Sequence, residues 1–206
     1  MRRRRDGGFT LIELLLTITI MGTISASLGT GLVLFLTNTD STIRRIAESH
    51  DAQLGTAYFA QDVASTGIRS STSPYNLVQS VDTTTTSAPL GLCGSGGTPV
   101  LRLGWDDPSS ATASTNVLVS YSVQTVAGQR SLHRLVCLGG STTATTDVVL
   151  VDNLDTTAPV VTCSTSCAGV GALVPQTVTM VLDIKNPADK GPTYFVTLVG
   201  HRRDTT

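Results

Sequence analysis

A long uncharged run near the N-terminus constrains this chain more than any other feature. From Phe9 to Leu36 the one charged residue is Glu13. As a helix, a run of this length would rise about 42 Å, which exceeds the roughly 30 Å hydrocarbon core of a bilayer. Because the arginines from Arg2 to Arg5 precede the run, the positive-inside rule predicts a cytoplasmic N-terminus and export of the remainder. A charge at the bilayer centre costs about 2.5–3.5 kcal/mol, so Glu13 is a candidate functional residue.

The helical pattern continues beyond Leu36 without a proline, and Gly67 is expected to end it after about Thr66. Apolar residues in this part mostly recur at steps of three or four, which predicts an amphipathic helix with one stripe for packing on a domain. The stripe consists of Ile43, Ile46, Ala47, Leu54, Ala57, Tyr58 and Val63. The helix from Phe9 to about Thr66 would be roughly 87 Å long.

The remainder of the chain has the pattern of β structure with Thr-, Ser- and Gly-rich connections. The stretch "NVLVSYSVQTV" alternates and places one face in the core, and "AGQR" then turns the chain into "SLHRLVCL" to form a hairpin. The face consists of Val117, Val119, Tyr121 and Val123. Further strands are expected at Val100–Trp105, Val148–Val151, Val178–Ile184 and Tyr194–Val199. We expect an α+β fold with one antiparallel sheet covered by the second half of the helix, and long irregular segments at 71–98 and 152–176.

The four cysteines favour disulfides, because their count is even and they follow an export segment. They are Cys93, Cys137, Cys163 and Cys167, and three pairings are open. The close pair in "CSTSC" could close a small loop by itself, which would leave Cys93 with Cys137. Free thiols are the second alternative. A zinc site is the third, and it is disfavoured because neither two CxxC-like clusters nor cysteines joined by histidines occur.

The stretch "GGFTLIELLLTI" resembles the processing site of type IV prepilins and the related pseudopilins. In that family a short basic leader ends in glycine, the mature chain begins with phenylalanine, and a glutamate is its fifth residue. Gly8, Phe9 and Glu13 match these positions. The resemblance implies that a prepilin peptidase cuts between Gly8 and Phe9 and methylates the new amine of Phe9.

The resemblance also implies a type IV pilin-like α+β architecture, in which a long helix packs on an antiparallel β-sheet domain. The expected organisation is a leader peptide at 1–8, a transmembrane and assembly half of the helix at 9–36, its amphipathic half at 37–67, and a β-rich pilin domain at 71–206. The chain would be a single-pass inner-membrane protein with a cytoplasmic N-terminus and an exported C-terminal domain. It would then enter a pilus or pseudopilus.

Charge and spacing explain why such a family would keep an acid in an apolar helix. Cleavage creates an ammonium at Phe9, and Glu13 lies four residues on, one helical turn away on the same face. At 4 Å and an effective dielectric constant of about 20, the raw attraction is ~4 kcal/mol before desolvation. A carboxylate paired with an ammonium of its own or an adjacent subunit is much less costly in lipid than a bare one. Glu13 is therefore expected to set the register in which helices stack into a filament.

The pattern after residue 70 resembles the J-type minor pseudopilins of type II secretion and the PilW-like minor pilins of type IV pili. This resemblance implies a minor subunit that helps to initiate or cap assembly. Its expected partners are the prepilin peptidase, the membrane, the assembly platform, the major pilin, and other minor pilins or pseudopilins. The alternatives are a DNA-binding or adhesive tip pilin of a competence or attachment pilus, a major pilin, and an anchored enzyme or binding domain unrelated to pili.

Composition and motifs disfavour several other classes. Residues 2–6 contribute +3 to a net charge of −1, so the rest of the chain carries −4 and has no basic footprint for nucleic acid. No GxSxG, HExxH or P-loop pattern occurs, and His50, His133 and His201 are far apart, so we expect no enzyme and no cofactor. The acids in "WDDPSS", Asp106 and Asp107, could bind calcium, but a turn is favoured.

The N-terminus has two rival interpretations. One is a conventional secretory signal, since "SAS" at 25–27 resembles a cleavage site for a signal peptidase, and the other is a plain single-span anchor. Conventional apolar regions are shorter, at about 7–15 residues. Here the apolar run resumes through Leu36, and Glu13 would be an unusual guest. Processing as a prepilin is therefore favoured.

Overall fold

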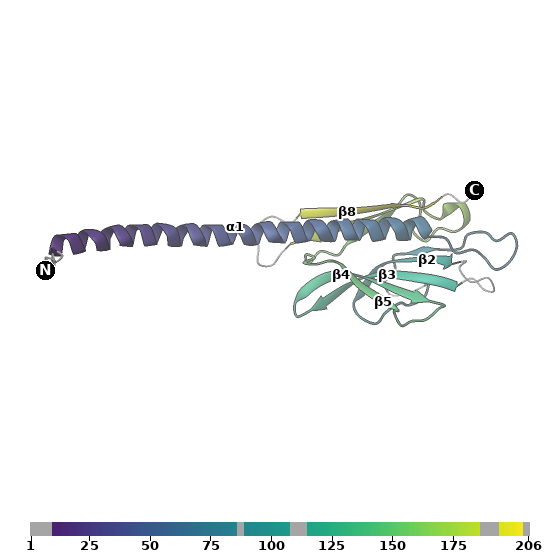
Figure 1. Ribbon diagram of the computed structural model, residues 1–206. Coiled ribbons are helices and arrows are strands. Elements are labelled where there is room, and N and C mark those ends of the chain that lie inside the picture. Colours follow the sequence, from purple (N-terminus) through teal and green to yellow (C-terminus); the bar gives the residue numbers. More distant parts are fainter. Residues whose placement is uncertain (1–9, 86–88, 108–114, 186–193, 204–206) are drawn as a thin grey trace, which may run out of the picture. The chain divides into compact units, whose positions relative to one another are not determined.

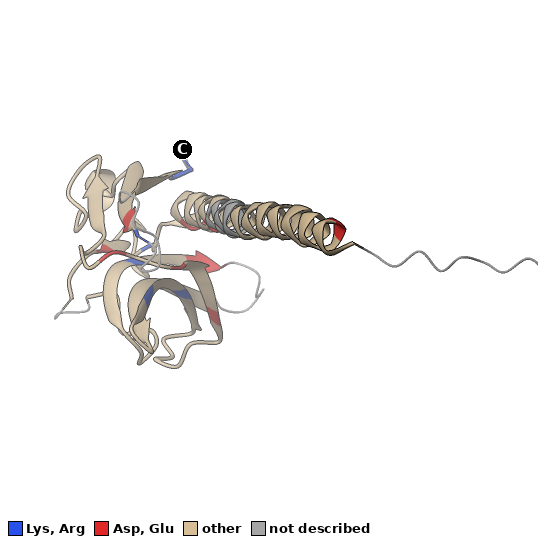
Figure 2. Ribbon diagram, turned by 90° about the vertical axis from the view of Figure 1, so that its left-hand side faces the viewer, with Lys and Arg blue, Asp and Glu red and all other residues tan. Residues whose placement is uncertain are grey.

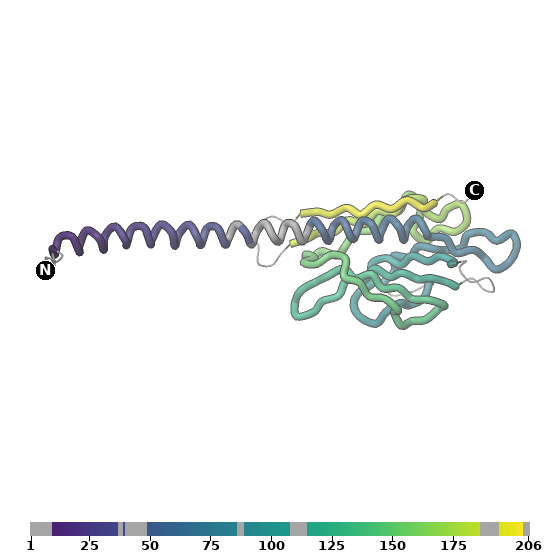
Figure 3. Tube along the Cα trace, in the orientation of Figure 1, coloured from purple at the N-terminus to yellow at the C-terminus, as the bar shows by residue number. Residues whose placement is uncertain are grey.

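The computed structural model describes residues 10–85, 89–107, 115–185 and 194–203, and it gives the backbone alone at 37, 38 and 40–48. The chain divides into two units, Met1–Ala47 and Glu48–Thr206. Helix α1 (Leu11–Ser65) contributes to both units (Figure 3). Eight strands and one short 3₁₀ helix, η1 (Gly171–Leu173), follow it in the described part of the second unit.

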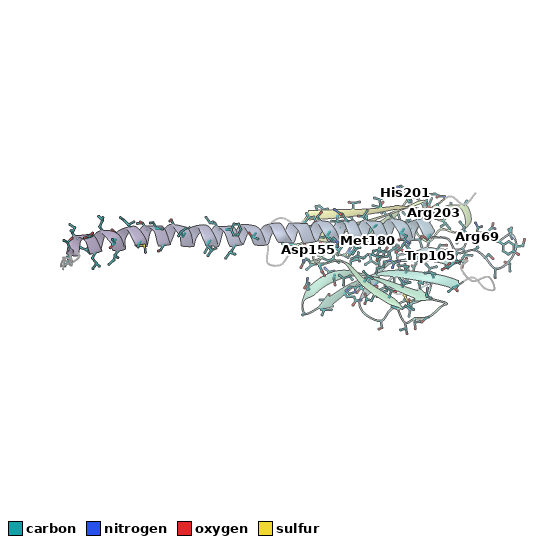
Figure 4. All side chains as sticks on the ribbon, in the orientation of Figure 1. Arg69, Trp105, Asp155, Met180, His201 and Arg203 are labelled. Carbon is teal, nitrogen blue, oxygen red and sulfur yellow. A yellow bond between two sulfur atoms is a disulfide. The ribbon has the colours of Figure 1, made fainter. Side chains whose placement is uncertain are left out.

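The end of α1 lies where the sequence predicts it. After Ser65, the Thr66 amide donates to the carbonyl of Val63 at 3.1 Å, and the Gly67 amide donates to Gly104 at 3.0 Å. Gly67 has φ 152°, a region that side chains disfavour, so a glycine is well suited to turn the chain from the helix to the sheet. It bridges to Trp105, which Figure 4 shows at the same end of the second unit as Arg69.

Five strands form one antiparallel sheet, in the order β1-β2-β3-β4-β5. They are β1 (Val81–Asp82), β2 (Thr98–Asp107), β3 (Thr115–Val126), β4 (Gln129–Leu138) and β5 (Thr146–Val151). The predicted hairpin is present, but its turn is shorter than "AGQR". Ala127 and Gly128 alone turn the chain, with φ of 52° and 84°, and Gln129 already pairs with Val126. Positive φ at both central residues is the geometry that matches the twist of the flanking strands.

Three further strands form a second antiparallel sheet, in the order β6-β7-β8, so the expectation of one sheet is wrong. They are β6 (Val160–Cys163), β7 (Thr177–Ile184) and β8 (Tyr194–His201). Two strands lie in segments that we expected to be irregular, β1 in 71–98 and β6 in 152–176. Both are short and give little alternation, which is why the sequence pattern did not reveal them.

Helix α1 packs against both sheets. In the second unit, β8 lies on one side of the helix and β2, β3 and β4 lie on another (Figure 1). Gly200 on β8 lies so close to the helix that a Cβ there would come within 2.4 Å of the Val63 Cβ. A glycine at this position is therefore needed for the helix and the second sheet to pack closely.

One core lies between the helix and the two sheets. The predicted face of β3 is buried in it, and Met180 and Leu182 of β7 reach it from the second sheet (Figure 4). From the predicted stripe of α1, Leu54, Tyr58 and Val63 contact this core. Ala57 is exposed instead, and Phe59, which the prediction omitted, is fully buried. The side chains of Ile43, Ile46 and Ala47 lie outside the described residues.

The four cysteines form two disulfides, Cys93–Cys137 and Cys163–Cys167, so one of the three open pairings is realised. Cys93–Cys137 joins positions 44 residues apart, and closure of such a loop stabilises a fold by about 4 kcal/mol on the chain-entropy model. The second bridge spans a separation of 4 residues and contributes about 2 kcal/mol by the same argument. Cys93–Cys137 therefore fastens the residues around Cys93 to the face of β4 that lies away from the core.

Candidate functional site

The N-terminal turn of α1 positions Glu13, the acid singled out by the sequence. The carbonyl of Thr10 accepts hydrogen bonds from the amides of Glu13 at 3.1 Å and of Leu14 at 3.2 Å, which starts the helix. Glu13 thus lies in the first turn. A carboxylate there is favoured by the helix dipole by about 0.3–1 kcal/mol, so the position suits an acid even before any partner is present.

The surface around Glu13 is apolar and uncovered. The segment Leu11–Leu36 has a mean hydropathy of 1.8 over its most apolar window, none of which is buried, and it is long and apolar enough to cross a membrane. Figure 2 shows the described part of this segment almost entirely in the colour of uncharged residues. So large an exposed apolar surface is characteristic of a helix that lies in lipid or against other apolar helices.

Hydroxyl groups in this segment are satisfied by the helix itself. The Thr17 hydroxyl donates to the Leu14 carbonyl at 2.8 Å, and the Thr30 hydroxyl donates to the Ala26 carbonyl at 2.8 Å. The same bond back to the preceding turn is made by Thr19, Thr23 and Ser27. Because lipid offers no hydrogen-bond partners, this internal satisfaction allows threonine and serine to lie in a membrane-spanning helix.

The predicted cleavage residues Gly8 and Phe9 lie outside the described residues. The pairing of Glu13 with the amine of Phe9 consequently remains a prediction. Among the described residues, no cation lies within ion-pair distance of Glu13.

A second polar cluster, which the sequence analysis missed, anchors α1 to the five-stranded sheet. Asp62 of α1 accepts two hydrogen bonds from Arg134 of β4, both at 2.7 Å, and one from the hydroxyl of Tyr121 at 2.6 Å. The guanidinium of Arg134 lies 4.9 Å from the ring centroid of Tyr58, one turn before Asp62. The ring of Tyr121 in turn packs edge-on against Phe59, with centroids 5.5 Å apart.

Burial and the Asp62 carboxylate determine the ionisation of this cluster. Burial raises the pKa of Tyr121 well above its ordinary value, and the charge of Asp62 raises it further, so the phenol stays protonated and donates. Burial alone would lower the pKa of Arg134, but its hydrogen bonds and charge interaction with Asp62 outweigh this, and the pKa is raised. The Arg134–Asp62 pair is therefore a mostly buried, bidentate ion pair that joins the helix to the sheet.

The other residues that the sequence analysis considered do not come together. His50 is exposed and lies 3.9 Å from Asp51, whereas His201 contacts Thr177 at 3.0 Å on the second sheet. His133 contacts Ser131 and Asp147 on the first sheet. Within the described ranges, no three side chains of the metal-ligating types form a group that could hold an ion.

Asp106 has a structural role at the end of the helix. Its Oδ2 accepts the backbone amide of Arg69 at 2.8 Å, which holds the chain after Gly67 against β2. Asp106 and Asp107 themselves lie in β2, whereas the rest of "WDDPSS", where we favoured a turn over a calcium site, lies outside the described residues.

Residues 3–29 match the family model of the prokaryotic N-terminal methylation motif. The matched range contains the basic residues, Gly8, Phe9 and Glu13, and the first part of the exposed apolar helix. No curated protein and no solved structure matches the chain. The match supports a type IV pilin-like precursor, and such a motif implies processing by a prepilin peptidase, anchoring in the membrane, and assembly with other pilins.

Proposed function

We propose that this chain is a minor pilin or pseudopilin, a structural subunit of a type IV pilus or a type II secretion-like filament. A prepilin peptidase processes it at Gly8–Phe9, and it helps to initiate or cap assembly. The observation that carries this proposal is the methylation motif at residues 3–29 running into an uncovered apolar helix whose one acid is Glu13.

The chemistry of the first helical turn supports an assembly role for that acid. Cleavage would leave a methylated ammonium four residues before Glu13, so each subunit would bring one cation and one anion into an apolar environment. An ion pair between neighbouring subunits satisfies both charges, and a helix displaced by one turn leaves both unpaired. An apolar contact alone would let neighbouring helices slide along each other. The ion pair of Glu13 would favour one alignment of these helices.

The second unit supports a minor role. It contains two sheets, two disulfides, and several connections that are irregular where described. An elaborate exported domain suits a subunit that is present in few copies at one end of a filament. In this proposal the partners are the prepilin peptidase, the assembly platform, the major subunit and other minor subunits.

The full-length precursor, expressed with a prepilin peptidase and the assembly machine, tests the proposal. We expect cleavage after Gly8, a methylated Phe9 in the mass spectrum of the mature chain, and loss of cleavage in a Gly8→Asp variant. Glu13→Gln should be cleaved normally but fail to enter sheared filaments. Glu48→Gln is the matched control, because it makes the same chemical change in the same helix outside the apolar run, and it should assemble.

Two results would count against the proposal: a leader that stays uncut at Gly8, and normal assembly of Glu13→Gln. Quantifying the chain in sheared filaments separates minor from major roles. A minor subunit should be present at well below one copy per major subunit, and its deletion should reduce the number of filaments more than their length.

A further inference from the structure

The five-stranded sheet carries a groove on the face that points away from α1, and the proposed function does not use it. The groove has a volume of about 720 Å³ and is partly open to solvent. Its floor comes from three strands, at Gln124 of β3, Leu135 of β4 and Asp147 of β5, and its two walls come from the segments 92–96 and 142–144. This volume lies within the roughly 300–1,000 Å³ that is typical of small-molecule sites.

Covalent and hydrogen bonds within the chain hold the walls of the groove in place. The disulfide Cys93–Cys137 joins the first wall to β4, and the Gly94 amide donates to the Thr142 carbonyl at 2.9 Å, which joins the two walls to each other. A Cβ at Gly94 would lie 2.4 Å from a terminal methyl carbon of Leu135, so a glycine here lets the wall approach the floor closely. The groove is therefore formed before any ligand binds, which lowers the entropic cost of binding.

The uncharged polar side chains of the lining can both donate and accept hydrogen bonds. They are the hydroxyls of Ser95, Thr142 and Thr143 and the amide of Gln124. Within the described ranges, the side chains of these four residues have no hydrogen-bond partner in the chain. Donors and acceptors of the groove are therefore available to a ligand that offers both kinds of group.

Asp147 supplies the one charge in the described lining of the groove. Its side chain is 49% exposed, and its Oδ1 lies 2.7 Å from the Nδ1 of His133. Because an ionised carboxylate can only accept, the histidine nitrogen carries the proton of this bond. The bond orients the carboxylate and leaves its Oδ2 to accept from a ligand. With an acid and no lysine or arginine in the described lining, the groove disfavours anionic ligands.

Apolar carbon faces the groove from both walls. Leu92 lines the first wall and is 57% exposed, and Ala144 lines the second wall. A ligand that fits the lining thus presents some C–H surface as well as hydroxyl groups. Exposed leucine beside a few convergent polar groups is the mixture expected of a small-molecule site.

We propose that this groove binds a neutral saccharide. The hydroxyls of a sugar ring both donate and accept, and the C–H groups of the ring form apolar surface, so the lining offers partners for each. The Asp147 Oδ2 accepts from one ring hydroxyl, the Gln124 amide and the Thr143 hydroxyl bond to others, and Leu92 and Ala144 contact C–H groups. An ammonium ligand fits less well, because it only donates and leaves the amide N–H of Gln124 without an acceptor.

An array of immobilised oligosaccharides tests this proposal on the full-length chain with both disulfides intact. The chain is solubilised in lauryldimethylamine oxide, because a glycoside detergent would compete for the groove. The array carries neutral glycans built from glucose, galactose, mannose and N-acetylglucosamine, together with sulfated forms of the same glycans. We expect at least one neutral glycan to bind.

That glycan is then titrated, free in solution, against variants of the lining. Asp147→Ala should raise the Kd about tenfold or more, since a hydrogen bond to a charged group is lost. Thr143→Val keeps the size of the side chain, removes one hydroxyl and should raise the Kd about two- to tenfold. Thr125→Val is the matched control, because it makes the same change at an exposed threonine of β3 outside the lining, and its Kd should equal that of the unmodified chain. Ser95→Trp fills the groove and should abolish binding.

Failure of every neutral glycan to bind would overturn the proposal, and so would binding to the sulfated forms alone. A Kd that is unchanged in both Asp147→Ala and Ser95→Trp would place the glycan elsewhere and would overturn it too. Urea unfolding midpoints equal to that of the unmodified chain show that a loss of binding is not a loss of fold. Ser95 is exposed, so Ser95→Trp keeps the test decisive even if Asp147→Ala unfolds. Cleavage at Gly8 and entry into filaments do not involve the groove, so the proposed function stands or falls separately.

Discussion

Glu13 and Asp62 lie in the same helix, α1, but in environments that differ in one decisive respect. Asp62 is buried against the five-stranded sheet, where Arg134 and Tyr121 of the same chain satisfy its carboxylate. Glu13 lies in a segment that nothing covers, and no cation of the described residues pairs with it. The difference shows that one half of the helix completes its interactions within the chain, whereas the described side chains of the other half leave an apolar surface that the chain itself does not cover.

The largest expected effect is the difference in stability between alanine variants of Asp62 and Glu13. Asp62→Ala leaves the mostly buried Arg134 without its counter-ion and the buried Tyr121 hydroxyl without its acceptor, which should lower the free energy of unfolding by about 3–5 kcal/mol. Glu13→Ala removes an exposed side chain and should change the free energy of unfolding by less than about 0.5 kcal/mol, although it should abolish filament entry. Urea unfolding of the full-length chain in micelles measures both values.

Gln61→Ala is the control for Asp62→Ala, because Gln61 is the exposed neighbour of Asp62 on the same helix. An Asp62→Ala loss no larger than that of Gln61→Ala would show that the buried ion pair does not anchor the helix. The contrast between the two halves of α1 would then rest on apolar packing alone.

Two phenylalanines offer the same comparison without charge. Phe59 is fully buried, whereas Phe35 is 66% exposed. Phe59→Ala should lower the free energy of unfolding by about 3–5 kcal/mol, because it removes buried apolar surface and leaves a cavity. Phe35→Ala should leave the free energy of unfolding within about 0.5 kcal/mol of the unmodified chain. Equal losses in the two variants would mean that the first half of the helix is stabilised within the chain after all.

Much of this contrast could be predicted from the sequence. The uncharged run, its single acid and the end of the helix at Gly67 follow from local residue patterns, because membrane insertion and helix termination depend on nearby residues. The alternation in β3 likewise predicted which side chains enter the core. In each of these features, the residues that determine the structure lie close together in the sequence.

The cluster around Asp62 could not be found in the same way, because Asp62 lies in α1, far along the chain from the β3–β4 hairpin that carries Tyr121 and Arg134. One clue was available, since a two-residue turn at Ala127–Gly128 places Tyr121 directly opposite Arg134. The sequence pattern instead predicted a four-residue turn, "AGQR", at this place. The second sheet was missed for a similar reason. Its strands pair over distances along the chain that a single sequence does not reveal.

Two glycines test how closely the packed half of α1 fits against the sheets, and the expected effects are smaller. A Cβ at Gly200 would lie 2.4 Å from the Val63 Cβ, so Gly200→Ala should destabilise the second unit by about 1–3 kcal/mol through overpacking. At Gly55 the nearest atom to an added Cβ is 3.6 Å away, an ordinary contact. Because alanine favours a helix, Gly55→Ala should stabilise by about 0.5–1 kcal/mol. Thermal unfolding of both variants checks the sign, and destabilisation by Gly55→Ala would refute the close fit described for the helix.

The smallest expected effect concerns Asp51, near the start of the packed part of α1. Burial, and then the charge of Asp152, raise the pKa of Asp51 above its usual value of 3.8. The folded chain therefore holds this proton more tightly than the unfolded chain, and stability falls as the pH rises from 3.8 through the raised pKa. Asp51→Asn removes the penalty, so at neutral pH it should stabilise the fold, by less than about 1 kcal/mol because solvent screens a partly exposed group. The gain should vanish below pH 3.8, where Asp51 is protonated in both states. Urea titrations at pH 3.5 and pH 7 compare Asp51→Asn with the unmodified chain. An equal gain in stability at the two pH values would show that the gain does not come from removing the charge of Asp51.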